Sequence, residues 1–291
     1  MCDETTQEDN ERALSTEMTR RRFGIAASTA ALALSLPASA DALEVVESDV
    51  TVTTPDGTAD CYYVHPAEGR HAAVLVWPDI FGLRPAFRLM GKRLAESGYS
   101  VLVVNPFYRK LRAPVVLPNP DDRRARENWE LLIPLARSLT PEGTASDAAA
   151  FVDFLDRQPS VDTSRRVGTT GYCMGGPLIM RTAAALPERV GAAASFHGGG
   201  LATDAEDSPH LLIPKMQAGF LIAIAENDHE KEPETKGILS AAFREAGLEA
   251  EIEVYEGALH GWCALDSQVY NQVAAERAWE RLLALFGKHL A

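Results

Sequence analysis

The chain has 291 residues, of which 46% are hydrophobic and 24% are charged, and its formal net charge at pH 7 is −13. These proportions are typical of a globular enzyme that buries one large core. The negative charge disfavours nucleic acid or an anionic membrane surface as a partner, because both require clustered lysine and arginine.

The first 40 residues have the layout of an export signal. Thr19-Arg20-Arg21-Arg22-Phe23 precedes an uncharged run rich in alanine and leucine, residues 24–36, which closes on Ala38-Ser39-Ala40. The run is short for a bilayer, and the arginines before phenylalanine resemble a twin-arginine signal. The alternative is an amphipathic helix of the mature fold. We predict an exported chain, periplasmic or extracellular, with residues 1–40 as the signal and residues 41–291 as one domain.

The first half of this domain reads as a hairpin followed by buried strands. Alternating residues around Pro55-Asp56-Gly57 predict antiparallel strands, and two uninterrupted apolar runs predict strands buried on both faces. The expected elements are strands at 50–54, 60–64 and 72–76, a helix at 86–96 and a strand at 100–104. Residues 105–142 contain several prolines and a charged patch, so we expect an irregular segment that covers the mouth of a site.

Helices and strands alternate in the second half. The expected elements are a helix at 145–157, a strand leading to Gly171, a helix after it, strands at 192–196 and 220–225, a helix at 232–246, a strand at 251–255 and a helix at 270–286. Apolar strands that alternate with helices indicate an α/β fold, with a mostly parallel sheet covered by helices on both faces.

Gly171-Tyr172-Cys173-Met174-Gly175 has the spacing of a nucleophile elbow, with cysteine in the serine position. The chain turns so sharply from strand to helix that side chains at the two glycine positions would clash. Cys173 would then stand at the first turn of a helix, whose dipole favours thiolate over thiol. The alternative is a glycine-rich loop with an inert, half-buried cysteine.

An acid and a histidine follow later strands, in the order that this elbow requires. Asp228 comes after the strand at 220–225 and His260 after the strand at 251–255, so both should reach the same edge of the sheet as Cys173. The acid can then polarise the histidine, which exchanges a proton with the thiol.

Other residues nearby leave alternatives open. Asp228 could instead cap a helix or form a turn. Competitors for the acid and base roles are Glu226, His229 and Glu230. We place His197, which is followed by three glycines, behind the site rather than in it.

Four stretches resemble the dienelactone hydrolase family, and the resemblance covers nearly all of the mature chain. They are Asp79-Ile80-Phe81-Gly82, Gly171-Tyr172-Cys173-Met174-Gly175-Gly176, Asp228-His229 and Gly257-Ala258-Leu259-His260. The resemblance implies an α/β-hydrolase fold and hydrolysis of lactones or activated esters without cofactor or metal. It also implies Cys173, Asp228 and His260 as the catalytic residues, and the backbone N–H groups of Ile80 and Met174 as the oxyanion hole.

The chain departs from this family at three positions. A glutamate that handles the proton of the nucleophile is replaced by Asp79, to which we give the same nucleophile-activating role. For the arginine that binds the substrate carboxylate, the best match is Arg126, which could equally belong to a solvated charge patch. A second arginine is absent after His260, where Trp262 stands. We assign Arg126 and Trp262 to substrate binding, and a carboxylated dienelactone fits less well with one arginine than with two.

We therefore predict a cysteine hydrolase that forms a thioester acyl-enzyme with a small lactone or ester, as a monomer without a membrane span in the mature chain. A thiolate is a good leaving group, so activated esters suit it and amides do not. One alternative is a broad carboxylesterase. Another is a protein that binds a ligand, or undergoes thiol redox chemistry, without turnover. Cys61 and Cys263 read as two buried thiols or, in an oxidising compartment, as a disulfide.

Overall fold

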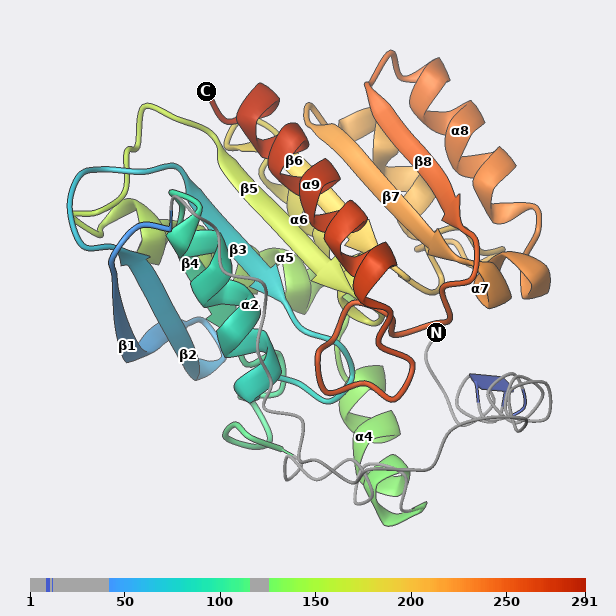
Figure 1. Cartoon of the computed structure of the whole chain (residues 1–291), viewed down its shortest axis with the longest axis horizontal. Helices are drawn as coiled ribbons and strands as arrows, with labels where there is room; N and C mark the ends of the chain where they lie inside the picture. The colour runs from blue at the N-terminus through green and yellow to red at the C-terminus, as the bar shows by residue number, and fades with distance from the viewer. Residues whose placement is uncertain (1–8, 11, 13–41, 116–125) are drawn as a thin grey trace, which may run out of the picture.

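The computed structural model describes residues 9–10, 12, 42–115 and 126–291. In these residues one eight-stranded sheet has the order β1-β2-β4-β3-β5-β6-β7-β8 (Figure 1). The pairs β1–β2 and β2–β4 are antiparallel, and the pairs from β4 to β8 are parallel. The prediction of an opening hairpin and a mostly parallel sheet is confirmed.

The elements agree closely with the hydrophobic pattern. The strands are β1 (Val45–Thr54), β2 (Gly57–Pro66), β3 (Ala73–Trp77), β4 (Ser100–Val104), β5 (Val167–Tyr172), β6 (Val190–Phe196), β7 (Gly219–Ala225) and β8 (Ala250–Tyr255). The helices are α2 (Pro85–Glu96), α4 (Arg126–Arg137), α5 (Pro141–Asp156), α6 (Gly175–Ala185), the 3₁₀ helix η1 (Pro209–Lys215), α7 (Glu226–Lys231), α8 (Thr235–Glu245) and α9 (Gln272–His289).

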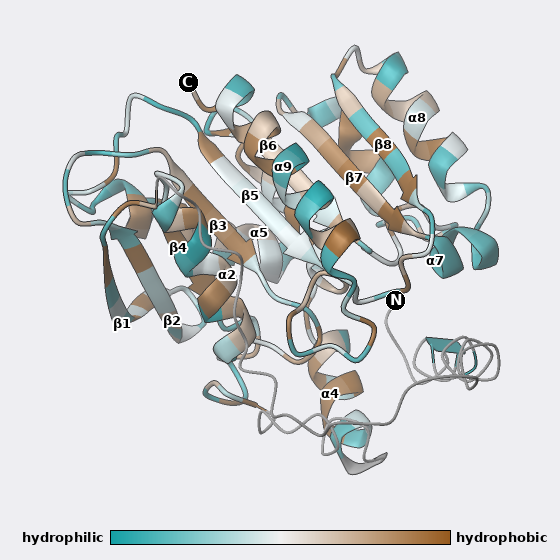
Figure 2. Ribbon diagram, viewed as in Figure 1, coloured by the Kyte–Doolittle hydropathy of each residue, from teal (hydrophilic) through white to brown (hydrophobic). Residues whose placement is uncertain are grey.

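Helices cover both faces of the sheet, as expected. One core cluster joins α5, α6 and α8 to one face, and a second joins α2 and α9 to the other. The central strands β3, β4, β5, β6 and β7 are buried along their whole length. Figure 2 shows apolar residues along β3 and β7, whereas α8 and α9 carry more hydrophilic residues. This arrangement explains the uninterrupted apolar runs in the sequence, since neither face of such a strand meets water.

Two helical segments differ from the prediction. Residues 126–137, which we expected to be irregular, form α4, with Pro134 inside the helix. Residues 226–231, where no helix was expected, form the short helix α7, and the helix expected at 232–246 is α8, which begins after Pro233. Burial of Trp129, Leu132 and Leu135 at helical spacing stabilises α4, and the surrounding prolines hide this periodicity.

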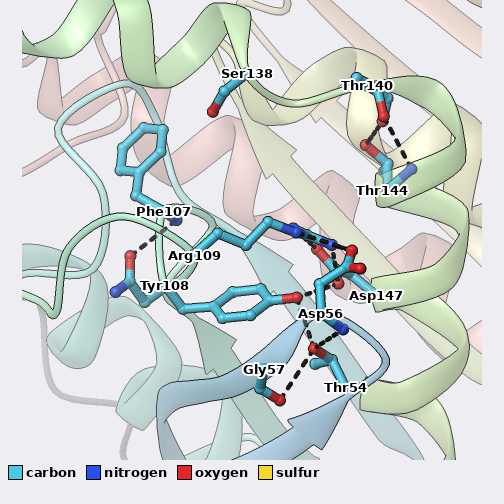
Figure 3. A network of polar contacts seen from close by, with 12 residues as sticks. Thr54, Asp56, Gly57, Phe107, Tyr108, Arg109, Ser138, Thr140, Thr144 and Asp147 are labelled. Atoms are coloured by element: carbon cyan, nitrogen blue, oxygen red, sulfur yellow. Dashed lines mark hydrogen bonds and ion pairs between the residues drawn. The ribbon is translucent and has the colours of Figure 1, made fainter.

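The loop after β4 is fixed by a network of polar contacts (Figure 3). The hydroxyl of Tyr108 donates to Asp147 of α5 at 2.7 Å and lies 2.7 Å from the hydroxyl of Thr54 in β1. Arg109 donates two hydrogen bonds to Asp147, at 2.7 and 2.8 Å, and also pairs with Asp56 in the hairpin turn. Two-point contacts of this kind hold a loop in one position. These contacts therefore also fix the position of Phe107, which directly precedes Tyr108 in the same loop.

The predicted export signal, residues 1–40, lies outside the described residues except for 9, 10 and 12. Among the residues that the structure describes, no helix combines the length and apolar character needed to cross a membrane.

Candidate active site

Cys173 lies at the sharp turn between β5 and α6. Its backbone φ is 53°, a left-handed value that is uncommon for a residue with a side chain. A Cβ at Gly171 would stand 2.2 Å from the backbone oxygen of Gly175, and a Cβ at Gly175 would stand 2.4 Å from that of Trp77. The two glycines are therefore required by close backbone contacts, and the elbow expected from the sequence is formed. Such strain in a tightly packed turn is typical of a functional position.

Asp228 and His260 meet at the carboxyl edge of the sheet. Asp228 lies in the first turn of α7, directly after β7, and His260 lies in the loop after β8. Nδ1 of His260 is 2.7 Å from a carboxylate oxygen of Asp228. The ring is nearly buried, so this contact fixes its orientation and leaves Nε2 as the nitrogen for proton exchange.

Asn227 is a residue that the sequence interpretation missed. Its side-chain oxygen accepts a hydrogen bond from the backbone N–H of His260 at 2.9 Å, while its amide donates to Asn10 at 2.9 Å. Asn10 in turn donates to the backbone oxygen of His260 at 2.8 Å. The one available signal was position, since Asn227 precedes Asp228 at the end of a buried strand. It holds the backbone that carries the histidine.

The charges around His260 favour its protonated form. Burial lowers the pKa of the imidazole, but the negative charges of Asp228 and Cys173 raise it, and the result is a pKa of about 10. Cys173 is 2% exposed, so water screens this interaction weakly. The site therefore favours a positively charged ring beside Cys173.

His197 lies behind His260, as the sequence suggested. Its φ is 42°, and its ring centre is 5.0 Å from those of His260 and Trp262. Within the described part of the chain, neither ring nitrogen of His197 has a hydrogen-bond partner. Burial, together with the charge of His260, holds the pKa of His197 well below its usual value. His197 is therefore a neutral ring that supports the histidine from behind.

This burial predicts a loss of stability in mild acid. Between about pH 5 and 6.5 the unfolded chain binds a proton at His197 and the folded chain does not, so the free energy of unfolding falls as the pH falls, by about 1.4 kcal/mol per unit. His260 adds little slope there, because its raised pKa keeps it protonated in the folded state and its ordinary pKa of about 6.5 keeps it mostly protonated in the unfolded chain. Urea unfolding at several pH values should show the slope in the wild type and lose it in His197→Phe. Equal slopes in both proteins would contradict it.

The residues predicted to form the oxyanion hole lie beside Cys173. Met174 caps α6, and Ile80 lies in the loop after β3, whose backbone packs against the elbow at Gly175. Both side chains belong to one apolar cluster with Cys173, which also includes Phe107 and, from α4, Trp129 and Leu132. Figure 1 shows α4 beyond the carboxyl ends of β3 and β5. Apolar side chains thus pack against Cys173 from the loop after β3 and from α4, while His260 interacts with its sulfur.

Asp79 pairs with a buried arginine, and Trp262 lies in the core. Both carboxylate oxygens of Asp79 bind the guanidinium of Arg84, at 2.6 and 2.9 Å. Trp262 is 0% exposed and stacks on Tyr255 with a ring distance of 5.2 Å, so it forms part of the core beneath the site. Arg126 begins α4, but its side chain lies outside the described residues.

The competing groups do not replace Asp228 at the histidine. Glu226 accepts a hydrogen bond from the backbone N–H of Gly257, at 3.2 Å.

Cys61 and Cys263 are separate buried thiols. They belong to clusters on opposite faces of the sheet, and burial raises the pKa of each. Among the described residues, no group of histidine, cysteine and acidic side chains could hold a metal ion.

Known proteins match both this sequence and this fold. The model of the dienelactone hydrolase family matches residues 59–290. Carboxymethylenebutenolidase of Pseudomonas putida is 26% identical over 75% of this chain and 86% of its own length. The enzyme of that name from Rhodococcus opacus is 26% identical over 80% of this chain and 88% of its own length.

A dienelactone hydrolase-like promiscuous phosphotriesterase from metagenomic libraries has the same fold, with a TM-score of 0.67 and 21% identity over 85% of this chain and 99% of that one. The elbow at Cys173 and the mostly parallel sheet agree with these matches. The chain is a hydrolase with an α/β-hydrolase fold, and it belongs to the dienelactone hydrolase family.

Proposed function

We propose that Cys173, His260 and Asp228 form a catalytic triad that hydrolyses lactones or activated esters through a thioester acyl-enzyme. The observation that carries this proposal is the 2.7 Å contact of Asp228 with His260, a ring that also interacts with Cys173. An acid, a histidine and a nucleophile linked in this way are the parts of acyl-transfer catalysis.

In the acylation step, the thiolate of Cys173 attacks the carbonyl carbon and a C–S bond forms. The N–H groups of Ile80 and Met174 donate to the oxyanion. The C–O bond to the leaving group then breaks, and the leaving oxygen takes the proton from Nε2 of His260. A thioester on Cys173 and a neutral histidine remain. When the substrate is a lactone, the leaving oxygen stays attached to the acyl group, because both belong to the same opened ring.

In the deacylation step, a water molecule loses its proton to His260 and its oxygen attacks the thioester. The C–S bond breaks, which gives the carboxylic acid product and restores the thiolate and the charged histidine. The thiolate is one of the groups that raise the pKa of His260, so its conversion to a neutral thioester lowers that pKa. The histidine can then act as the base.

We further propose that the acyl part of the substrate is uncharged. The cluster around Cys173 is apolar, and it includes Trp129 and Leu132 of α4. The position after His260 that carries an arginine in the family holds no arginine here. A substrate carboxylate buried in such surroundings would lack a bidentate partner at that position, and an unpaired buried charge is costly.

The test compares a neutral enol lactone with the same lactone carrying a carboxylate, using steady-state kinetics. We expect kcat/KM to be at least about 10-fold higher for the neutral compound, because desolvating one unpaired charge costs more than the 1.4 kcal/mol that this ratio represents. Intact-mass measurement after rapid quenching should detect the acyl group on Cys173. A preference for the carboxylated lactone would contradict the proposed substrate class. No turnover of either, with a thiol that alkylates rapidly, would favour the binding or redox alternative.

A further inference from the structure

Arg84 is a buried arginine between two loops of the site. It directly precedes α2, at the N-cap position, and is 2% exposed. Its Nη1 and Nη2 bind the two carboxylate oxygens of Asp79, at 2.6 and 2.9 Å. Its Nε and Nη2 bind the two carboxylate oxygens of Asp266, at 2.8 and 3.0 Å. One guanidinium thus joins two carboxylates, each through two hydrogen bonds.

These contacts satisfy a group that would otherwise be costly to bury. Removing a charge from water is unfavourable unless it is paired with good geometry. Burial alone would lower the pKa of Arg84, but Asp79 and Asp266 raise it, so the guanidinium stays charged. The rings of Phe81 and Phe87 lie 5.4 and 4.9 Å from its central carbon. Lysine could not reproduce this planar two-sided fork.

The two carboxylates belong to the loops that carry the candidate catalytic groups. Asp79 directly precedes Ile80, and it also accepts the backbone N–H of Phe81 at 2.9 Å. Asp266 lies six residues after His260, in the loop that leads to α9. The loop that contributes an oxyanion donor is therefore held against the loop that contributes the histidine.

We propose that Arg84 is a positioning residue, and that Asp79 and Asp266 are its two anchors. This inference rests on the proposed function of Cys173, His260 and Ile80. The arginine sets the distance between the oxyanion donor and the histidine, so that both reach one carbonyl group. Misplacement of a catalytic group by about 1 Å can lower the rate by about 100-fold.

The same contacts give Asp79 a role other than activation of the nucleophile. One of its oxygens accepts hydrogen bonds from Arg84 and from the N–H of Phe81, and the other accepts a hydrogen bond from Arg84. The guanidinium next to it offsets its charge, although Arg84 shares its own charge with Asp266. Asp79 therefore holds the loop, while the proton of the thiol goes to His260.

The experiment compares four variants with the wild type on the neutral enol lactone. They are Arg84→Lys, Asp79→Asn, Asp266→Asn and the control Arg189→Lys. Arg189 makes a similar two-point pair with Asp156, at 2.6 and 3.1 Å, at the amino end of β6 and away from the site. Each protein is measured for kcat, KM, Tm and the pH dependence of Cys173 alkylation by iodoacetamide.

We expect Arg84→Lys and Asp266→Asn to lower kcat by about 10- to 100-fold with KM changed less than about 3-fold. Arg189→Lys should lower Tm by less, because this pair is partly exposed, and leave kcat unchanged. Asp79→Asn should lower kcat but leave the midpoint of the alkylation profile within about 0.3 pH units of wild type, since His260 and not Asp79 sets the ionisation of the thiol.

Three results would overturn the inference. Unchanged kcat in Arg84→Lys and Asp266→Asn would show that the arginine does not position the site. A kcat that falls only in proportion to the folded fraction would show a purely structural role. A shift of about one pH unit or more in the alkylation midpoint of Asp79→Asn would show that Asp79 acts on the thiol.

The outcomes also separate this inference from the proposed function. If the wild type turns over neither lactone, the proposed function fails, yet the alkylation profile of Asp79→Asn still tests the role of Asp79. Asp266→Asn leaves the pair of Arg84 and Asp79 intact, so it remains informative if Arg84→Lys does not fold.

Discussion

Replacing Cys173 with alanine should lower kcat for the neutral lactone by at least about 10⁴-fold, because the covalent step has no other nucleophile at the elbow. The sulfur is held by a turn that Gly171 and Gly175 make possible, and its charge is one cause of the raised pKa of His260. The variant should therefore also lower the pKa of His260, which titration of the ring by NMR would record. Steady-state kinetics would measure the loss of turnover.

Cys61→Ala is the matched control for this variant. Cys61 is 2% exposed, as Cys173 is, but its thiol lies on β2 in the core and burial raises its pKa. We expect Cys61→Ala to lower Tm through lost packing and to keep kcat. If Cys173→Ala retained turnover, or if Cys61→Ala lost it while folded, Cys173 would not be the nucleophile.

Asp228→Asn should lower kcat by about 10⁴-fold with little change in the fold. The carboxylate holds a proton on Nδ1 of His260, at 2.7 Å. An amide can donate to Nδ1 instead, which places the ring proton on Nε2 and leaves that nitrogen unable to accept the proton of the thiol. The pKa of His260 should fall as well, since Asp228 raises it. Alkylation of Cys173 near pH 7 should then become slower, and kcat and the alkylation rate are the two measurements.

Glu226→Gln is the control for this second variant. Glu226 is two residues before Asp228 and binds the backbone N–H of Gly257 rather than the histidine. We expect it to keep most of the activity, because an amide oxygen can accept the same hydrogen bond. A large loss in Glu226→Gln with activity retained in Asp228→Asn would identify Glu226 as the acid.

Local patterns predicted the elbow and the sheet because their causes are local. The glycines around Cys173 are required by backbone contacts of the turn itself, within a few residues. Uninterrupted apolar runs indicate strands that are buried on both faces of the sheet. The order of Cys173, Asp228 and His260 then follows from strands that end at one edge of the sheet.

Residues whose partners are distant in the sequence could not be found in this way. Arg84 becomes informative only when Asp266, from a loop far along the chain, is placed next to it. Nothing in the sequence distinguishes Asn227 from other polar residues. Its role follows from the hydrogen bond that its side chain accepts from the backbone N–H of His260. Prolines obscured the helical period of α4 in the sequence. The apolar side chains of this helix are buried against Cys173 and its neighbours, which lie far along the chain.

The two outer strands of the sheet carry charged side chains that bear on whether the sheet can grow. β1 and β8 are at the ends of the strand order, where a further chain could add a strand. β1 exposes Glu47 and Asp49, which pair with Lys92 and Arg88 of α2. On β8, Glu251 and Glu253 pair with arginines of α9. A second copy that docked edge to edge would have to remove these charged pairs from water, so growth of the sheet into fibrils is opposed at both margins.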